Sequence, residues 1–147
     1  AAALAPFDRP DGESPYQIQH ALQDMMQDLV GIVRREDEMR RALDGIEALR
    51  TRAAGAGVTG NREYNPGWHT ALDLGNLLTI SEAIARAALD RRESRGGHFR
   101  EDYPDKDPAQ ARFNVVVRQG PGGEMQLERV PIRPIPDALK VVIEEEQ

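Results

Sequence analysis

Four features that are missing or scarce in this chain restrict the folds and the functions that it can have. None of its 147 residues is cysteine, which excludes disulfide bonds and thiolate metal sites. Aromatic residues make up only 5% of the chain, so a core must be built from aliphatic side chains, as in a helical bundle. No apolar run approaches the roughly 20 residues of a membrane-spanning helix. Cations are not in excess, and the net charge of −6 opposes binding to nucleic acid.

A helical pattern is what the chain does contain. The first helical segment, 15–34, follows Ser14, which suits an N-cap, and begins with Pro15, which suits the first helical position. Gln17 completes a capping box with Ser14. Apolar residues recur along the segment at three- and four-residue spacing, namely Ile18, Leu22, Met25, Leu29 and Ile32. This spacing predicts one amphipathic helix.

Two further helices are predicted over 36–54 and 66–92. Gly55 follows the second helix and suits its C-terminal end. Asn65 suits the N-cap of the third helix, and Pro66 suits its first turn. Three helices with short connections predict a mainly α fold, an antiparallel three-helix bundle. We expect the following residues in its core: Leu22, Met25, Leu29, Leu43, Ile46, Leu77 and Ile84.

The chain on either side of the bundle has a different pattern. Residues 1–13 are rich in proline and glycine and have no periodicity, which predicts a tether before a bundle that occupies 14–104. Within 105–147, alternating apolar residues on both sides of a Gly-Pro-Gly-Gly turn predict a small β-hairpin. An irregular tail follows, and we expect its acidic end, 141–147, to be frayed or extended.

The predicted hairpin needs a partner. An isolated hairpin is only marginally stable in water. We therefore expect it to pack on the bundle, with which it would form one domain, or on a domain outside this chain.

A glycine run and three histidines are further candidates for binding sites. Residues 55–60 match the dinucleotide pattern G-x-G-x-x-G, but they follow a helix and no strand pattern precedes them. A dinucleotide site needs a strand before the glycines and a helix after them, so we interpret this run as a helix end and a loop. His20, His69 and His98 have no metal-ligand spacing, and we expect no metal residues here.

The densest group of polar residues lies directly after the third helical segment. Residues 93–104 read E-S-R-G-G-H-F-R-E-D-Y-P, and Arg95, His98 and Arg100 are the cations in this motif. The two arginines could hold a carboxylate substrate. They could equally tie the loop to acidic groups or carbonyls of a neighbouring domain, and the residues alone leave both possibilities open.

Three segments of the chain resemble one protein family. The 93–104 motif resembles the run E-S-R-G-x-H-x-R-x-D-x-P of succinate dehydrogenase and fumarate reductase flavoprotein subunits, and L-aspartate oxidases carry a related run. Residues 21–27 resemble the family's A-L-Q-x-x-M-Q segment, and 72–77 resemble its L-x-L-x-N-L segment. The resemblance extends over about 14–136 and implies the C-terminal helical domain of such a subunit.

The resemblance also implies what the longer protein does. Such a protein interconverts succinate and fumarate and passes electrons from FAD to an iron–sulfur subunit, in the tricarboxylic acid cycle and electron transport. It implies as partners the flavin and capping domains of the same chain, the iron–sulfur subunit and a membrane anchor. It implies a peripheral location on the cytoplasmic side of the cytoplasmic membrane.

No catalytic or cofactor-binding residue is carried over to this chain. The family's flavin-binding, substrate-binding and proton-donating motifs lie in its earlier domains and have no match in these 147 residues. We therefore expect a non-catalytic fragment in which Arg95, His98 and Arg100 are interdomain contact candidates, partly exposed and paired with water or with carboxylates such as Glu101 and Asp102. The alternative is a stand-alone helical protein-interaction module, which the self-contained helical pattern favours but which leaves the motif unexplained.

Overall fold

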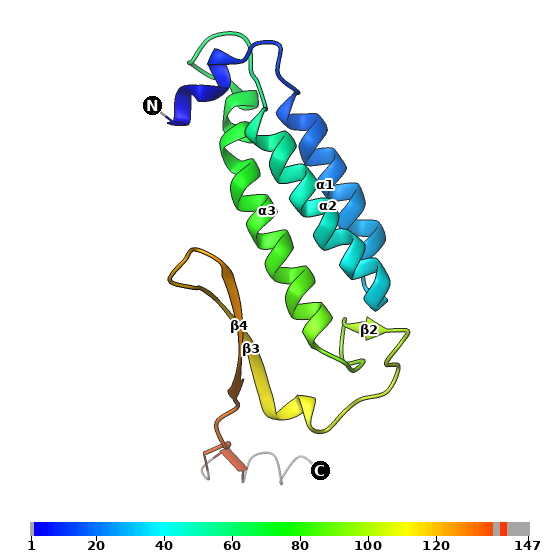
Figure 1. Ribbon diagram of the computed structural model, residues 1–147. Coiled ribbons are helices and arrows are strands. Elements are labelled where there is room, and N and C mark those ends of the chain that lie inside the picture. The colour runs from blue at the N-terminus through cyan, green and yellow to red at the C-terminus, as the bar shows by residue number, and fades with distance from the viewer. Residues whose placement is uncertain (1, 137–138, 141–147) are drawn as a thin grey trace. The chain divides into compact units, whose positions relative to one another are not determined.

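The computed structural model describes residues 2–136 and 139–140, and the chain divides into two compact units, Ala1–Asp107 and Pro108–Gln147. The first unit holds three long helices, which lie side by side in Figure 1: α1 (Pro15–Val30), α2 (Glu36–Ala54) and α3 (Pro66–Asp90). The second unit holds an antiparallel β-hairpin. The predicted mainly α fold, a three-helix bundle followed by a hairpin, is confirmed.

The helix ends follow their sequence signals in part. The Oδ1 atom of Asn65 accepts a hydrogen bond from Trp68 N at 3.0 Å, so it caps α3 as predicted. The predicted capping box of α1 is wrong, because the Ser14 side chain makes no cap hydrogen bond. Helix α1 also ends at Val30 instead of residue 34, and Ile32, expected on its apolar stripe, is 70% exposed.

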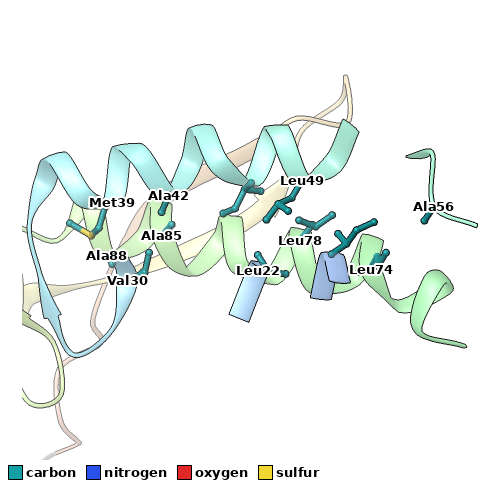
Figure 2. Close-up of a cluster of buried hydrophobic side chains, with 12 residues drawn as sticks. Leu22, Val30, Met39, Ala42, Leu49, Ala56, Leu74, Leu78, Ala85 and Ala88 are labelled. Carbon is teal, nitrogen blue, oxygen red and sulfur yellow. The ribbon is translucent and has the colours of Figure 1, made fainter. Parts of the chain in front are cut away.

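The core runs along the inside of the bundle. Figure 2 shows side chains of α2 facing those of α3. The buried residues of this cluster are Ile18, Leu22, Val30, Met39, Ala42, Ile46, Leu49, Ala56, Leu74, Leu78, Ala85 and Ala88.

The predicted core was correct in part. Leu22 and Ile46 are buried, whereas Met25, Leu29, Leu43 and Leu77 are partly buried and pack against the cluster. The prediction that Ile84 lies in the core is wrong. Its side chain is 45% exposed, because it lies on the outer face of α3 next to the buried Ala85.

The N-terminal segment, expected to be a tether, is structured. Ala2–Asp8 forms a 3-10 helix, η1, whose Pro6 is buried. The carbonyl of Pro6 accepts a hydrogen bond from Val58 N at 3.0 Å, and the Ala3 carbonyl accepts one from Trp68 Nε1 at 2.6 Å. A Cβ atom on Gly57 would overlap the carbonyl oxygen of Arg9, so the glycine-rich loop serves this close backbone approach.

The second unit is the predicted hairpin. Strand β3 (Phe113–Gln119) pairs with β4 (Met125–Pro131) from Phe113↔Pro131 to Gln119↔Met125. The expected packing of the hairpin on the bundle stays a prediction. The predicted acidic tail, 141–147, lies outside the described residues. None of the described helices is long and apolar enough to cross a membrane.

Candidate functional site

The 93–104 motif folds back across one end of the bundle. It contains β2 (Phe99–Arg100), which pairs in parallel with β1 (Val33–Arg34) between α1 and α2. The Ile32 carbonyl accepts a hydrogen bond from Phe99 N at 3.1 Å, and the Arg34 carbonyl accepts one from Glu101 N at 3.0 Å. Figure 1 shows β2 at the opposite end of the bundle from η1. The pairing extends the backbone after α1, which explains why that helix ends earlier than its apolar pattern predicts.

A two-residue turn positions β2. Arg95 N donates to the His98 carbonyl at 2.8 Å, and His98 N donates to the Arg95 carbonyl at 3.1 Å. Gly96, the first residue of the turn, has a φ of +58°, a conformation that disfavours any side chain. Gly97 has no such φ, and a Cβ atom on it would meet nothing within 4 Å.

Arg100 is the centre of the motif and is fully buried, with 0% exposure. Its Nε and Nη2 atoms donate to Oδ1 and Oδ2 of Asp102 at 2.7 and 2.6 Å, which is a bidentate pair. Its Nη1 atom donates to the carbonyls of Ala88, Leu89 and Arg91 at 3.1 to 3.3 Å. These carbonyls end α3, so the guanidinium group lies at the negative end of that helix.

Asp102 connects this cation to the start of α2. Its Oδ2 atom accepts a hydrogen bond from Glu36 N at 3.2 Å. The N-cap residue of α2, Arg35, makes no side-chain cap, so Asp102 supplies an acceptor from a distant part of the sequence. The bonds from Arg100 are the largest cause that lowers the pKa of Asp102, although burial opposes them.

Arg34 caps the C-terminal end of α1 in a similar way, and His98 connects Arg34 to the end of α3. Arg34 Nε donates to the carbonyls of Gly31 and Val30 at 2.6 and 3.3 Å, which caps α1. Arg34 Nη1 lies 2.6 Å from His98 Nδ1, and His98 Nε2 lies 3.1 Å from the Arg91 carbonyl. Nδ1 therefore accepts and Nε2 donates, which is the neutral imidazole. Burial lowers the pKa of His98, and the charges of Arg34, Arg100 and Arg91 lower it further.

Glu93 is the second buried charge of the motif. Its side chain is 0% exposed and accepts hydrogen bonds from Arg95 Nε and Nη2, both at 3.0 Å, and from Asp107 N at 2.9 Å. Arg91 Nη1 also donates to it. These bonds, with Arg95 first, overcome the effect of burial and lower the pKa of Glu93 to about 2.

Ser94 joins the two halves of the motif. Its hydroxyl oxygen accepts from Arg100 N at 2.8 Å, and its proton is donated to the Tyr103 carbonyl at 2.9 Å. The ring of Tyr103 lies 5.0 Å from the Arg100 guanidinium carbon, a cation–π contact. The motif is therefore a hydrogen-bonded cluster that fixes three helix ends together.

The family model that matches is "Fumarate reductase flavoprotein C-term", and it matches residues 19–143. The chain belongs to this family. The succinate dehydrogenase flavoprotein subunit of Coxiella burnetii is 33% identical over 81% of this chain and 21% of that protein. The L-aspartate oxidase of Streptomyces coelicolor is 32% identical over 82% of this chain and 22% of that protein. The chain thus spans about a fifth of the length of these curated relatives.

Solved structures agree with the family. A chain of Mycobacterium smegmatis Sdh1 in complex with UQ1 has a TM-score of 0.89 and 39% identity, over 99% of this chain and 25% of that chain. The adenylylsulfate reductase of Archaeoglobus fulgidus, at 22% identity and a TM-score of 0.79 over 90% of this chain and 24% of that one, shares the fold.

Family membership gives meaning to the spacing of the motif. Six of its eight specified letters, Glu93, Ser94, Arg95, His98, Arg100 and Asp102, correspond to side chains bonded within the cluster. Gly96 forms the turn, and Pro104 is exposed. Of the four unspecified positions, Gly97, Phe99 and Glu101 are exposed, whereas Tyr103 is half-buried and contacts Arg100 through its ring. A pattern of this kind is what a structural cluster requires, because each buried polar group must find its partner.

The structure corrects one expectation for the three candidate residues. Arg100 is buried instead of partly exposed, and Asp102, as expected, is its carboxylate partner. Arg95 is 40% exposed at its side chain and His98 is half-buried. The three lie in one cluster, but Arg95 pairs with Glu93, a residue that the sequence reasoning did not select.

Residues outside the motif were also missed. Arg34 and Glu36 complete the cluster through their hydrogen bonds to His98 and Asp102. No local sequence signal marked them, because only the β1–β2 pairing brings them next to the motif. No group of three or more metal-ligating side chains that could hold a metal ion occurs in the described part of the chain.

Proposed function

We propose that this chain is the C-terminal structural domain of the flavoprotein subunit of a succinate dehydrogenase or fumarate reductase. In that subunit succinate and fumarate are interconverted, and electrons pass from FAD to an iron–sulfur subunit. The observation that carries the proposal is the cluster at the helix ends. Its charged groups are bonded within the bundle, as a bracing domain requires, and the family match supports the identity of the parent.

The chain itself performs no catalysis in this proposal. The Nε, Nη1 and Nη2 atoms of Arg100 all donate to acceptors in the bundle, so this side chain has little capacity left for a carboxylate substrate. The described residues also do not fit FAD. The 55–60 glycine run follows α2 and contacts the N-terminal segment, whereas a flavin pyrophosphate needs glycines between a strand and a helix. FAD would therefore be held by earlier domains of the longer polypeptide.

Interdomain contact is assigned to the exposed part of the cluster. Arg95 leaves part of its guanidinium group at the surface while Glu93 fixes its position, so it is the best placed of the three candidates. His98 uses both ring nitrogens, and Arg100 is enclosed. The further partners in this proposal are the iron–sulfur subunit and a membrane anchor, with a peripheral location on the cytoplasmic side of the membrane.

L-aspartate oxidase chemistry is the second candidate for the parent, because that relative is 32% identical to this chain, close to the 33% of the succinate dehydrogenase subunit. The stand-alone interaction module is the third, and the closed core of the bundle favours it.

One experiment separates these candidates. The full-length product of the native gene is purified beside the 147-residue chain, and both are tested for bound flavin and for oxidation of succinate and of L-aspartate. We expect flavin and succinate oxidation in the full-length protein, and a colourless chain whose melting temperature does not change with succinate, fumarate or malonate. Flavin bound to the short chain would contradict the proposal, oxidation of L-aspartate instead of succinate would select the second candidate, and a native gene that starts near Ala1 would select the third.

A further inference from the structure

The short segment 105–107, which leads from the motif to the second unit, is bonded to the start of the motif. The Asp105 carbonyl accepts a hydrogen bond from Ser94 N at 3.0 Å, and Asp107 N donates to Oε2 of Glu93 at 2.9 Å. Proline follows Asp107 and has no N–H group, so Asp107 N is the last amide that can anchor this segment. The first unit ends at the same residue. The buried carboxylate of Glu93 thus anchors the chain at the boundary of the unit.

Arg95 contacts both the anchor and the anchored residue. Its Nε and Nη2 atoms donate to Glu93, both at 3.0 Å, and Nη2 also donates to the Asp107 carbonyl at 3.4 Å. The hydrogen bonds to Glu93 are the main cause that raises the pKa of Arg95, and the charge of Asp107 raises it further. Glu93 is fully buried and Asp107 is half-buried, whereas Arg95 is exposed. Arg95 is therefore the member of this group that can be reached from outside.

We propose that Glu93, Arg95 and Asp107 form a clasp that holds 105–107 on the first unit and that opens without unfolding of the bundle. The clasp would decide whether the connection to the hairpin unit is held or released. Few bonds hold this segment, and none of the residues of the buried apolar cluster lies beyond Ala88. A segment with few buried apolar contacts is expected to open locally, at a lower free energy than global unfolding. This inference rests on contacts within the 147 residues and does not depend on the proposed function.

A lysine-specific protease tests the clasp, because the chain contains two lysines, Lys106 and Lys140. Lys106 lies between the two anchored residues, and Lys140 is a reference site in the same molecule. Cleavage follows the population of the open form when closing is faster than cleavage. In the 147-residue chain, Arg95→Ala should increase the rate of cleavage after Lys106 about tenfold, because charge-assisted bonds to Glu93 are lost, and should leave cleavage after Lys140 unchanged. Arg95→Lys should have a smaller effect, because it keeps the charge but not the two-pronged geometry.

The matched control is Arg35→Ala. The Arg35 side chain is also exposed and ion-paired, 3.4 Å from Asp37, and has no ion pair with 105–107 among the described residues. Its removal should change the cleavage rate at neither lysine.

Hydrogen exchange provides a second measurement on the same variants. The Asp107 amide should exchange faster in Arg95→Ala by about the factor seen for cleavage, while the amides of α1 and α2 change far less. Unchanged cleavage after Lys106 together with unchanged exchange at Asp107 would overturn the clasp. An equal rise of exchange at Asp107 and along the helices would also overturn it, because 105–107 would then open only when the bundle unfolds.

Discussion

Arg100 and Asp102 form a bidentate ion pair between the C-terminal end of α3 and the N-terminal end of α2. The cation binds the carbonyls that end one helix, and the anion accepts from the first amide of the next. Each charge therefore faces a helix end of opposite sign. The attraction of the two charges to the helix ends adds to the attraction between the two side chains, and both stabilise the junction. This relationship makes the motif a device for holding helices together.

Breaking the pair should be strongly destabilising. Arg100→Met leaves Asp102 and three helix-end carbonyls without their donor and should lower the free energy of unfolding by about 3–5 kcal/mol. Asp102→Asn keeps an acceptor for Glu36 N and should cost less. Urea denaturation of the 147-residue chain measures both, and the double variant should cost less than the sum of the two single variants. Additive costs would show that the two side chains act independently.

Mild acid should destabilise the cluster through His98. Its pKa is lowered in the folded state from 6.5, so the unfolded chain takes up the proton more readily. The free energy of unfolding should therefore fall as the pH drops below 6.5 and level off below the folded-state pKa. Protonation removes the acceptor at Nδ1 and adds a cation facing Arg34, Arg91 and Arg100.

Chemical denaturation at several pH values measures this slope, and His98→Gln should flatten it. Glu93 and Asp102 act at lower pH: their pKa values are lowered, so their stabilisation is lost only below the ordinary values of 4.5 and 3.8. An unchanged slope near pH 6 in His98→Gln would assign the acid sensitivity to other groups.

The two adjacent glycines of the motif should respond differently to alanine. Gly96→Ala forces a side chain into a φ of +58° and should cost about 1 kcal/mol. Gly97→Ala adds its methyl group to open space and should be nearly neutral. The melting temperatures of the two variants provide the comparison, and equal losses would place the constraint outside the turn.

The contrast between Leu78 and Ile84 checks the core. Leu78 is 1% exposed within the bundle, so Leu78→Ala should cost about 2–5 kcal/mol. Ile84→Ala should cost far less in the 147-residue chain, because the Ile84 side chain is 45% exposed there. Equal costs in urea denaturation would mean that the outer face of α3 is covered within this chain.

The sequence predicted what local rules control. Apolar periodicity and the Asn65 cap gave the three helices, with α2 matched at both ends. The predictions failed where contacts between segments that are distant in the sequence determine the structure. Helix α1 stops early because β2 pairs with the chain after it, and η1 is structured because Trp68 and the 55–60 loop bind it.

The candidate site shows the same division. The motif was found because its residue types are unusual after a helix. The burial of Arg100 was missed because it depends on Asp102 and on the carbonyls of α3 converging in space. Local sequence spacing does not report such convergence.

The central claim, that the motif is structural, is tested most directly by Arg95→Ala in the full-length protein. Arg95 is the most exposed of the three cations, and Glu93 would lose its strongest partner. We predict less bound flavin and a lower melting temperature, with turnover per bound flavin close to that of wild type. Normal flavin content and stability, with turnover reduced about a thousandfold, would contradict the account and place Arg95 on the substrate.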